Sequence, residues 1–174
     1  FLTPYLDLVA TAIGADIVPI TGENRILAFY GLQIINSLPR VGFQAIIKEI
    51  NKKKLSITDV VFIIAPRINA AVRMEHALRA VDLMLTTDPK EAQEMAHAID
   101  RFNQDRRETD KKITQEALSQ IKSLKEEERT TTVVYQKDWH KGVIGIVASR
   151  LTETYYRPTL VFTKSGEKKL AASA

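Results

Sequence analysis

The 174-residue chain contains no cysteine, which excludes disulfide bonds and thiolate chemistry. This absence fits a reducing compartment, and we expect a cytoplasmic protein. No apolar run approaches the roughly 18 to 20 residues that a membrane-spanning helix needs. Residues 1–7 lack the basic start and the long apolar stretch of a signal peptide. We therefore expect no membrane partner.

Histidine and tryptophan are also scarce. There is one tryptophan, and the three histidines, His76, His97 and His140, are not adjacent to one another. Lys and Arg number 25 against 21 Asp and Glu, which gives a net charge of +4 and a pI near 9.3. This balance mildly favours a polyanionic partner, although it says nothing about the fold.

Three regions differ in pattern, and together they predict an α/β protein. In residues 1–88 the spacing of apolar residues predicts helices over 7–15, 25–35, 41–51 and 74–85. Residues 59–65 form an apolar run rich in β-branched residues that ends before Pro66, so we predict a buried strand there.

Residues 89–129 predict one long helix that ends near residue 128. The sequence Thr86-Thr87-Asp88-Pro89 supplies an N-cap followed by proline in the first turn. Such a helix would be on the order of 55 to 60 Å long, too long for one compact domain of this size, so we interpret it as a connector. Its polar middle, residues 104–108, is either exposed to solvent or in contact with another part of the protein.

Residues 130–174 predict a β-α-β unit. Strands are expected over 131–135 and 159–163, with a helix over 143–155 between them, which implies parallel strands in a mainly parallel or mixed sheet. Residues 170–174 read as the start of a further strand, so we expect the sheet to be incomplete and the chain to be a fragment.

Asp16 is the first candidate for chemistry. It stands between small and apolar residues at the expected end of a helix, and carboxylate oxygens are the ligands that hard divalent metals prefer. The alternative is that Asp16 only caps a turn. Asp7 has the same ambiguity and is better explained as an acidic residue in the first turn of a helix.

Two further segments combine cationic, polar and small side chains. In residues 66–74, Arg67 and Arg73 flank Asn69 at an expected helix start, where phosphate could bind; the alternative is a solvated surface. His140 follows Trp139 in an expected loop, where it either contacts a base or phosphate or merely bonds the backbone beside a buried indole.

Three motifs resemble the RecJ single-strand-specific exonucleases of the DHH phosphoesterase superfamily. They are DLVATAIGADIVPI at residues 7–20, PRINAAVRM at 66–74 and WHKGVIGIVASRL at 139–151. The resemblance implies the end of a DHH domain in residues 1–88, a connecting helix in 89–129 and the start of a DHHA1 domain in 130–174. It also implies a metal-dependent exonuclease that hydrolyses single-stranded DNA from the 5′ end in repair and recombination.

The resemblance also assigns roles to individual residues. Asp16 would be a catalytic ligand of a Mn²⁺ or Mg²⁺ cluster, and Arg67 and Arg73 would act on the phosphate. The substrate would be bound by the side chains of Asn69, His140, Lys141, Arg150 and Ser173. Val72 stands where the family usually has glycine.

The other metal ligands of the family, including its Asp-His-His motif, do not occur in this sequence. We therefore expect the 174 residues alone to be inactive, and a monomer whose partner is single-stranded DNA. Two alternatives stay open: a DHH-type phosphodiesterase acting on short oligonucleotides or cyclic dinucleotides, and a noncatalytic single-strand-binding module.

Overall fold

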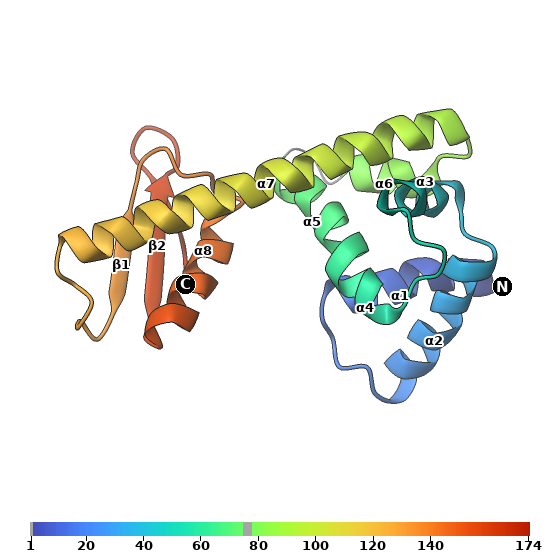
Figure 1. Cartoon of the computed structure of the whole chain (residues 1–174), viewed down its shortest axis with the longest axis horizontal. Coiled ribbons are helices and arrows are strands. Elements are labelled where there is room, and N and C mark those ends of the chain that lie inside the picture. The colour runs from blue at the N-terminus through green and yellow to red at the C-terminus, as the bar shows by residue number, and fades with distance from the viewer. Residues whose placement is uncertain (1, 75–77) are drawn as a thin grey trace. The chain divides into compact units, whose positions relative to one another are not determined.

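The computed structural model describes residues 2–74 and 78–174 and divides into two compact units, Phe1–Asn103 and Gln104–Ala174 (Figure 1). Both contain part of one helix, α7 (Pro89–Ser123), because the division falls inside it. Helices and a small mixed sheet confirm the predicted α/β class. The predicted domain boundaries after residues 88 and 129 stay a prediction.

All secondary-structure elements in the described part of the first unit are helices. Its elements before α7 are η1 (Thr3–Tyr5), α1 (Leu6–Ala15), α2 (Gly22–Ser37), α3 (Val41–Ile50), α4 (Ile57–Asp59), η2 (Val60–Ile64), α5 (Ala65–Met74) and α6 (Leu78–Leu85). The helices predicted over 7–15, 25–35 and 41–51 are confirmed. Of the helix predicted over 74–85, α6 is confirmed, Met74 ends α5, and residues 75–77, with His76, lie outside the described residues.

The strand predicted over residues 59–65 is wrong, because this segment is helical from α4 through η2 to α5. Ser56 begins it with a capping box, in which its hydroxyl accepts from the N–H of Asp59 and the carboxylate of Asp59 accepts from the N–H of Ser56. η2 is a π-helical turn that ends two residues before Pro66. The wider turn accommodates a proline, whose ring would clash with the carbonyl four residues earlier in a regular helix.

A buried ion pair fixes α1 within the first unit. Asp7 is 1% exposed, and its two carboxylate oxygens accept from Nε and Nη2 of Arg40 at 2.5 and 2.8 Å. Arg40 also donates to the carbonyl oxygens of Pro4 and Met84, so one guanidinium joins three segments. Asp7 is therefore a structural residue as well as an acidic residue of the first turn, and its carboxylate raises the pKa of Arg40.

The second unit contains the rest of α7, β1 (Thr132–Tyr135), α8 (Ile144–Tyr155), β2 (Thr159–Lys164) and β3 (Leu170–Ser173). β1 pairs with β2 in parallel, with Thr132 opposite Thr159, which confirms the predicted β-α-β unit. β3 adds an antiparallel strand to β2, with Val161 opposite Ser173. The sheet is therefore mixed, and its buried residues alternate along β1 and β2.

Arg157 organises the loop that follows α7. It is 9% exposed and donates to Thr132 Oγ1 and to the carbonyl oxygens of Glu126, Glu127 and Arg129. Its guanidinium also lies 4.7 Å from the centre of the Tyr155 ring. A buried cation is tolerated only when its donors are satisfied, and the loop carbonyls do this here.

The long helix α7 is confirmed, although it ends at Ser123 rather than near residue 128. Within its polar middle Asp105, Arg107 and Glu108 are exposed, whereas the flanking Asn103 and Asp110 are only 3% and 1% exposed. The polar stretch thus lies between two enclosed polar residues. No helix in the described parts of the chain is long and apolar enough to cross a membrane.

Acid should weaken the first unit through Asp59. Hydrogen bonds from Lys52 and from Ser56 lower the pKa of Asp59 to about 2, below the ordinary value of 3.8. A carboxyl group whose folded pKa is depressed stabilises the fold above its unfolded pKa and loses that contribution as pH falls. We expect the free energy of unfolding to fall between about pH 4 and pH 2, and to fall less steeply in Asp59→Asn.

Urea titrations across this pH range measure the effect. Asp138→Asn is the matched control, because the side chain of Asp138 is 76% exposed and its ion pair is with the exposed side chain of Lys137. Equal pH slopes in Asp59→Asn and the unsubstituted protein would contradict this account. Ser56→Ala removes the cap and should cost about 1 kcal/mol at neutral pH.

Candidate nucleic-acid interface

Asp16 lies at the exposed C-terminal end of α1. Its backbone N–H donates to the carbonyl of Ala12 at 3.0 Å, and its carboxylate has no bonding partner among the described residues. The next residue, Ile17, has a φ of 52° and is 78% exposed. A β-branched side chain in the left-handed region is strained, which marks this turn as one that the local sequence does not favour.

α1 packs against η2 and α5, so the end of α1 and the arginine-bearing helix are neighbours within the first unit. Gly14 permits this approach, because a Cβ there would lie 2.9 Å from Cγ1 of Val60. The close packing places Asp16 at the end of a rigidly held helix.

α5 separates the three residues that were predicted to bind phosphate together. Asn69 and Arg73 are four residues apart and lie on one side of the helix, whereas Arg67 is turned by roughly 120° from Arg73. Asn69 is half-buried and Arg73 is exposed in the last turn. Asn69 and Arg73 are therefore the pair that α5 brings together.

Arg67 makes internal contacts in this structure. Its Nη2 lies 2.7 Å from Oδ1 of Asp100 on α7, and its Nη1 donates to the carbonyl of Ile63. Its Nε is buried and has no acceptor within the described chain. A phosphate at Arg67 would compete with Asp100, and the observed role of Arg67 is to hold α5 against α7.

In the second unit the indole of Trp139 is buried and the imidazole of His140 is exposed. Trp139 is 4% exposed, and its Nε1 donates to Oε2 of Glu116 at 2.8 Å. The Nδ1 of His140 accepts from the N–H of Gly142 at 3.1 Å. An accepting Nδ1 leaves the proton of a neutral ring on Nε2, where an anion could receive it.

Ser173 and Gly145 meet at the first turn of α8. A Cβ at Gly145 would lie 3.1 Å from Oγ of Ser173, so the absence of a side chain at Gly145 permits this approach. The backbone carbonyl of His140 accepts from the N–H groups of Val143 and Ile144 just before this turn. The structure thus brings His140 and Ser173 to the same end of α8.

Lys141 and Arg150 are engaged with other side chains. Lys141 Nζ donates to Oγ of Ser165 at 2.9 Å. Arg150 Nη2 lies 2.7 Å from Oδ2 of Asp110, whose side chain is 2% exposed. Arg150 therefore joins α8 to α7 and lies away from the first turn of α8.

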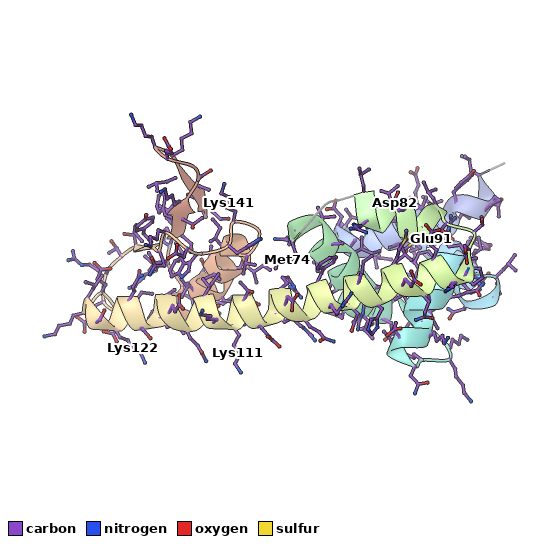
Figure 2. The ribbon with its side chains drawn as sticks, turned by 90° about the horizontal axis from the view of Figure 1, so that it is seen from above. Met74, Asp82, Glu91, Lys111, Lys122 and Lys141 are labelled. Atoms are coloured by element: carbon purple, nitrogen blue, oxygen red, sulfur yellow. The ribbon has the colours of Figure 1, made fainter. Side chains whose placement is uncertain are left out.

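A surface hollow of about 310 Å³ borders His140. It is lined by Thr109, Lys112, Ile113, Glu116, Gln136, Asp138, Trp139 and His140. Its lining carries both signs of charge, so it does not resemble a purely cationic phosphate site. In Figure 2, Lys111 and Lys122 project from the side of α7 that faces away from the sheet, whereas Lys141 lies beyond the opposite side.

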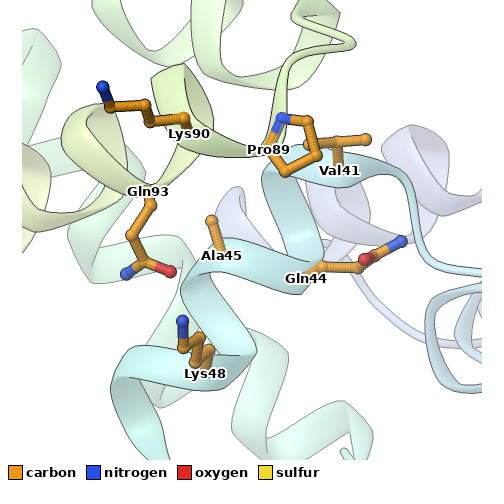
Figure 3. A pocket seen from close by; sticks show the side chains of 7 residues that line it. All are labelled: Val41, Gln44, Ala45, Lys48, Pro89, Lys90 and Gln93. Carbon is orange, nitrogen blue, oxygen red and sulfur yellow. The ribbon is translucent and has the colours of Figure 1, made fainter.

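A second hollow, of about 470 Å³, lies between α3 and the start of α7 in the first unit (Figure 3). It is lined by Val41, Gln44, Ala45, Lys48, Pro89, Lys90 and Gln93. The lining contains none of the predicted site residues.

Sequence reasoning missed the acceptors that hold the second unit together. Asp110 and Glu116 bind Arg150 and Trp139, and the amide of Gln120 donates to the carbonyl of Tyr135 at 2.9 Å. The sequence could have indicated these contacts only through the positions of Asp110, Glu116 and Gln120 beside the buried stripe of α7.

Among residues 2–74 and 78–174, no three His, Cys, Asp or Glu side chains come together as a metal site. Asp16 can supply one hard oxygen ligand, and a six-coordinate Mg²⁺ or Mn²⁺ needs more.

Comparison with known proteins extends over nearly the whole chain. The single-stranded-DNA-specific exonuclease RecJ of Haemophilus influenzae is 37% identical over an alignment of 178 positions, which covers 99% of this chain and 31% of that protein. RecJ of Bacillus subtilis is 37% identical over 95% of this chain and 21% of its own length. The crystal structure of Thermus thermophilus RecJ in complex with Mn²⁺ superposes with a TM-score of 0.83 at 33% identity, over 92% of this chain and 24% of that one.

Over nearly all of its length the chain is thus similar, in sequence and in structure, to part of the RecJ exonucleases. It spans about a third of the length of the Haemophilus relative and less of the Bacillus one. No family model matches it. The RecJ resemblance and the α/β fold that it implied are thereby confirmed, whereas the roles of individual residues stay predictions.

Replacing Arg150 should mainly lower the free energy of unfolding, because its side chain is engaged with Asp110 rather than free for the substrate. Arg150→Met leaves the carboxylate of Asp110 buried without its cation, and we expect a loss of about 2 kcal/mol because the pair is half-exposed on the arginine side. The double variant Arg150→Met/Asp110→Leu should recover most of this loss. Denaturant titration measures both.

Arg129→Met is the control. Arg129 is exposed, and its backbone carbonyl and N–H make its contacts with Arg157 and Glu126. If Arg150→Met were as stable as this control, the structural role of Arg150 would be refuted.

Proposed function

We propose that this chain is the segment of a RecJ-type exonuclease that contributes one metal ligand and two substrate-contacting surfaces. The supporting observation is the match to RecJ proteins over almost all of its length in both sequence and structure. The substrate would be single-stranded DNA, hydrolysed from the 5′ end during repair and recombination. A monomeric state and a cytoplasmic location remain part of this proposal.

The first surface would consist of Asp16 with Asn69 and Arg73. An exposed carboxylate without a partner among the described residues is suited to a divalent cation, and RecJ structures are known with Mn²⁺ and with Mg²⁺. Such an ion, when bound, lowers the pKa of a water ligand and stabilises charge on a phosphate. Asn69 and Arg73 share a side of α5 and would hold phosphate oxygens.

The second surface would consist of His140 and Ser173 at the first turn of α8. The exposed Nε2 of His140 and the hydroxyl of Ser173 can both donate to phosphate oxygens. Lys141 would add positive charge, whereas Arg150 and Arg67 would act by positioning α8 and α5.

We further propose that these 174 residues do not hydrolyse DNA alone. Asp16 is one ligand, and the described residues offer no cluster around it. We expect no release of mononucleotides from a 5′-phosphorylated single strand by the purified chain with Mn²⁺. Activity that disappears on adding a chelator would refute this.

Asp16→Ala tests the metal role in a full-length protein that contains this chain. We expect Mn²⁺-dependent release of mononucleotides to fall by at least about a hundredfold, because a charged ligand is lost from the metal site. Glu128→Ala is the control, since Glu128 also carries a carboxylate and is exposed. Circular dichroism checks that both variants fold.

Four outcomes are informative. Loss of activity in Asp16→Ala alone supports the proposal, whereas unchanged activity reduces Asp16 to a helix cap. A protein that cleaves dinucleotides or cyclic dinucleotides but not long strands would be a short-substrate phosphodiesterase. Metal-independent strand binding without hydrolysis would indicate a binding module.

A further inference from the structure

α2 carries an exposed apolar stripe that the proposed function does not use. Ile26, Phe29 and Tyr30 are 58%, 57% and 53% exposed and follow helical spacing, while Ala28, Gly31 and Ile35 are buried on the other side. Gly31 brings α2 against α1, since a Cβ there would lie 2.0 Å from the carbonyl oxygen of Leu6. In Figure 1 α1 lies along one side of α2.

A lysine-bearing loop is fixed beside this helix. The side chain of Asn36 donates to the carbonyl of Leu55 at 2.9 Å and accepts from its N–H at 2.7 Å. Leu55 is 2% exposed, so this end of the loop is anchored in the core. Lys53 and Lys54 are therefore held alongside α2, and they have no bonding partner within the described chain.

The helix and the loop enclose a groove of about 600 Å³. Phe29 and Gln33 line it from α2 and Lys53 and Lys54 from the loop, and no acidic residue contributes to the lining. Phe29 packs edge-to-face with Tyr30, with ring centres 5.3 Å apart. The groove thus combines a positioned aromatic ring with two cations.

We propose that this groove is an additional binding surface for single-stranded DNA. Phe29 stacks on a base, while Lys53 and Lys54 contact the flanking phosphates. An aromatic side chain beside cationic ones is the combination that binds single strands without regard to sequence. A protein partner would need acidic residues opposite Lys53 and Lys54 in addition to an apolar surface opposite Phe29, whereas every nucleotide of a single strand supplies both a base and a phosphate. The inference rests on the proposed substrate and extends it to a second contact region.

Binding is measured with a fluorescent oligothymidylate and the full-length protein that contains this chain, in a chelator so that no strand is hydrolysed. Phe29→Ala should weaken binding by roughly fivefold to a hundredfold, the range for loss of one stacked base. Phe62→Ala is the matched control: Phe62 is 71% exposed in the same unit but lies outside the groove lining.

The lysines are tested by salt dependence. Lys53→Ala/Lys54→Ala should make the slope of log affinity against log salt less steep by about 1.4, since each phosphate contact on a single strand contributes about 0.7. Lys48→Ala/Lys90→Ala removes the same charge from the hollow of Figure 3 and should leave the slope unchanged.

Crosslinking locates the contact directly. A strand carrying 5-iodouracil should crosslink to a peptide of α2 in the unsubstituted protein and not in Phe29→Ala. Equal affinities for Phe29→Ala and Phe62→Ala, with no crosslink on α2, would overturn the proposal and favour a protein partner for the stripe. Because hydrolysis is not measured, failure of the proposed nuclease function would leave the binding result interpretable.

Discussion

Both units depend on α7 as one unbroken helix. Its first part buries Ala92, Ala96 and Ile99 in the core of the first unit, and its second part buries Ile113, Ala117 and Ile121 in the second. A helix of this length gains most of its stability from packing rather than from intrinsic propensity. Each unit therefore stabilises the part of α7 that it covers.

Polar contacts fix the elements that pack on α7. Asp100 binds Arg67 of α5 in the first unit; in the second, Asp110 binds Arg150 of α8 and Glu116 binds the indole of Trp139. Each contact joins a motif residue to the shared helix. Removing one partner of such a pair leaves a poorly solvated charge or donor behind, so these contacts determine orientation as well as stability. Arg67, Arg150 and Trp139 thus hold their own segments against α7, and this positions the other residues of the same motifs.

The sequence predicted the regular elements well because their signals are local and periodic. The failure at residues 59–65 has a physical cause: five β-branched or aromatic residues favour a strand by propensity, but burial of Val60 and Ile64 four residues apart is helical. The capping box at Ser56 and Asp59 was the overlooked signal. The roles of Arg67 and Arg150 could not be predicted, since each pairs with an acid more than 30 residues away.

The candidate residues differ in what their side chains contact. Asp16 and His140 are exposed, whereas Arg67 and the half-exposed Arg150 are engaged in ion pairs. The strain at Ile17 supports the proposed role of Asp16. A backbone conformation that costs about 1–3 kcal/mol persists only where the surrounding structure imposes it. If Asp16 only capped the end of α1, a glycine at position 17 would adopt the same backbone conformation without strain. A turn that must hold a carboxylate in one direction is a place where surrounding structure would impose such a backbone conformation.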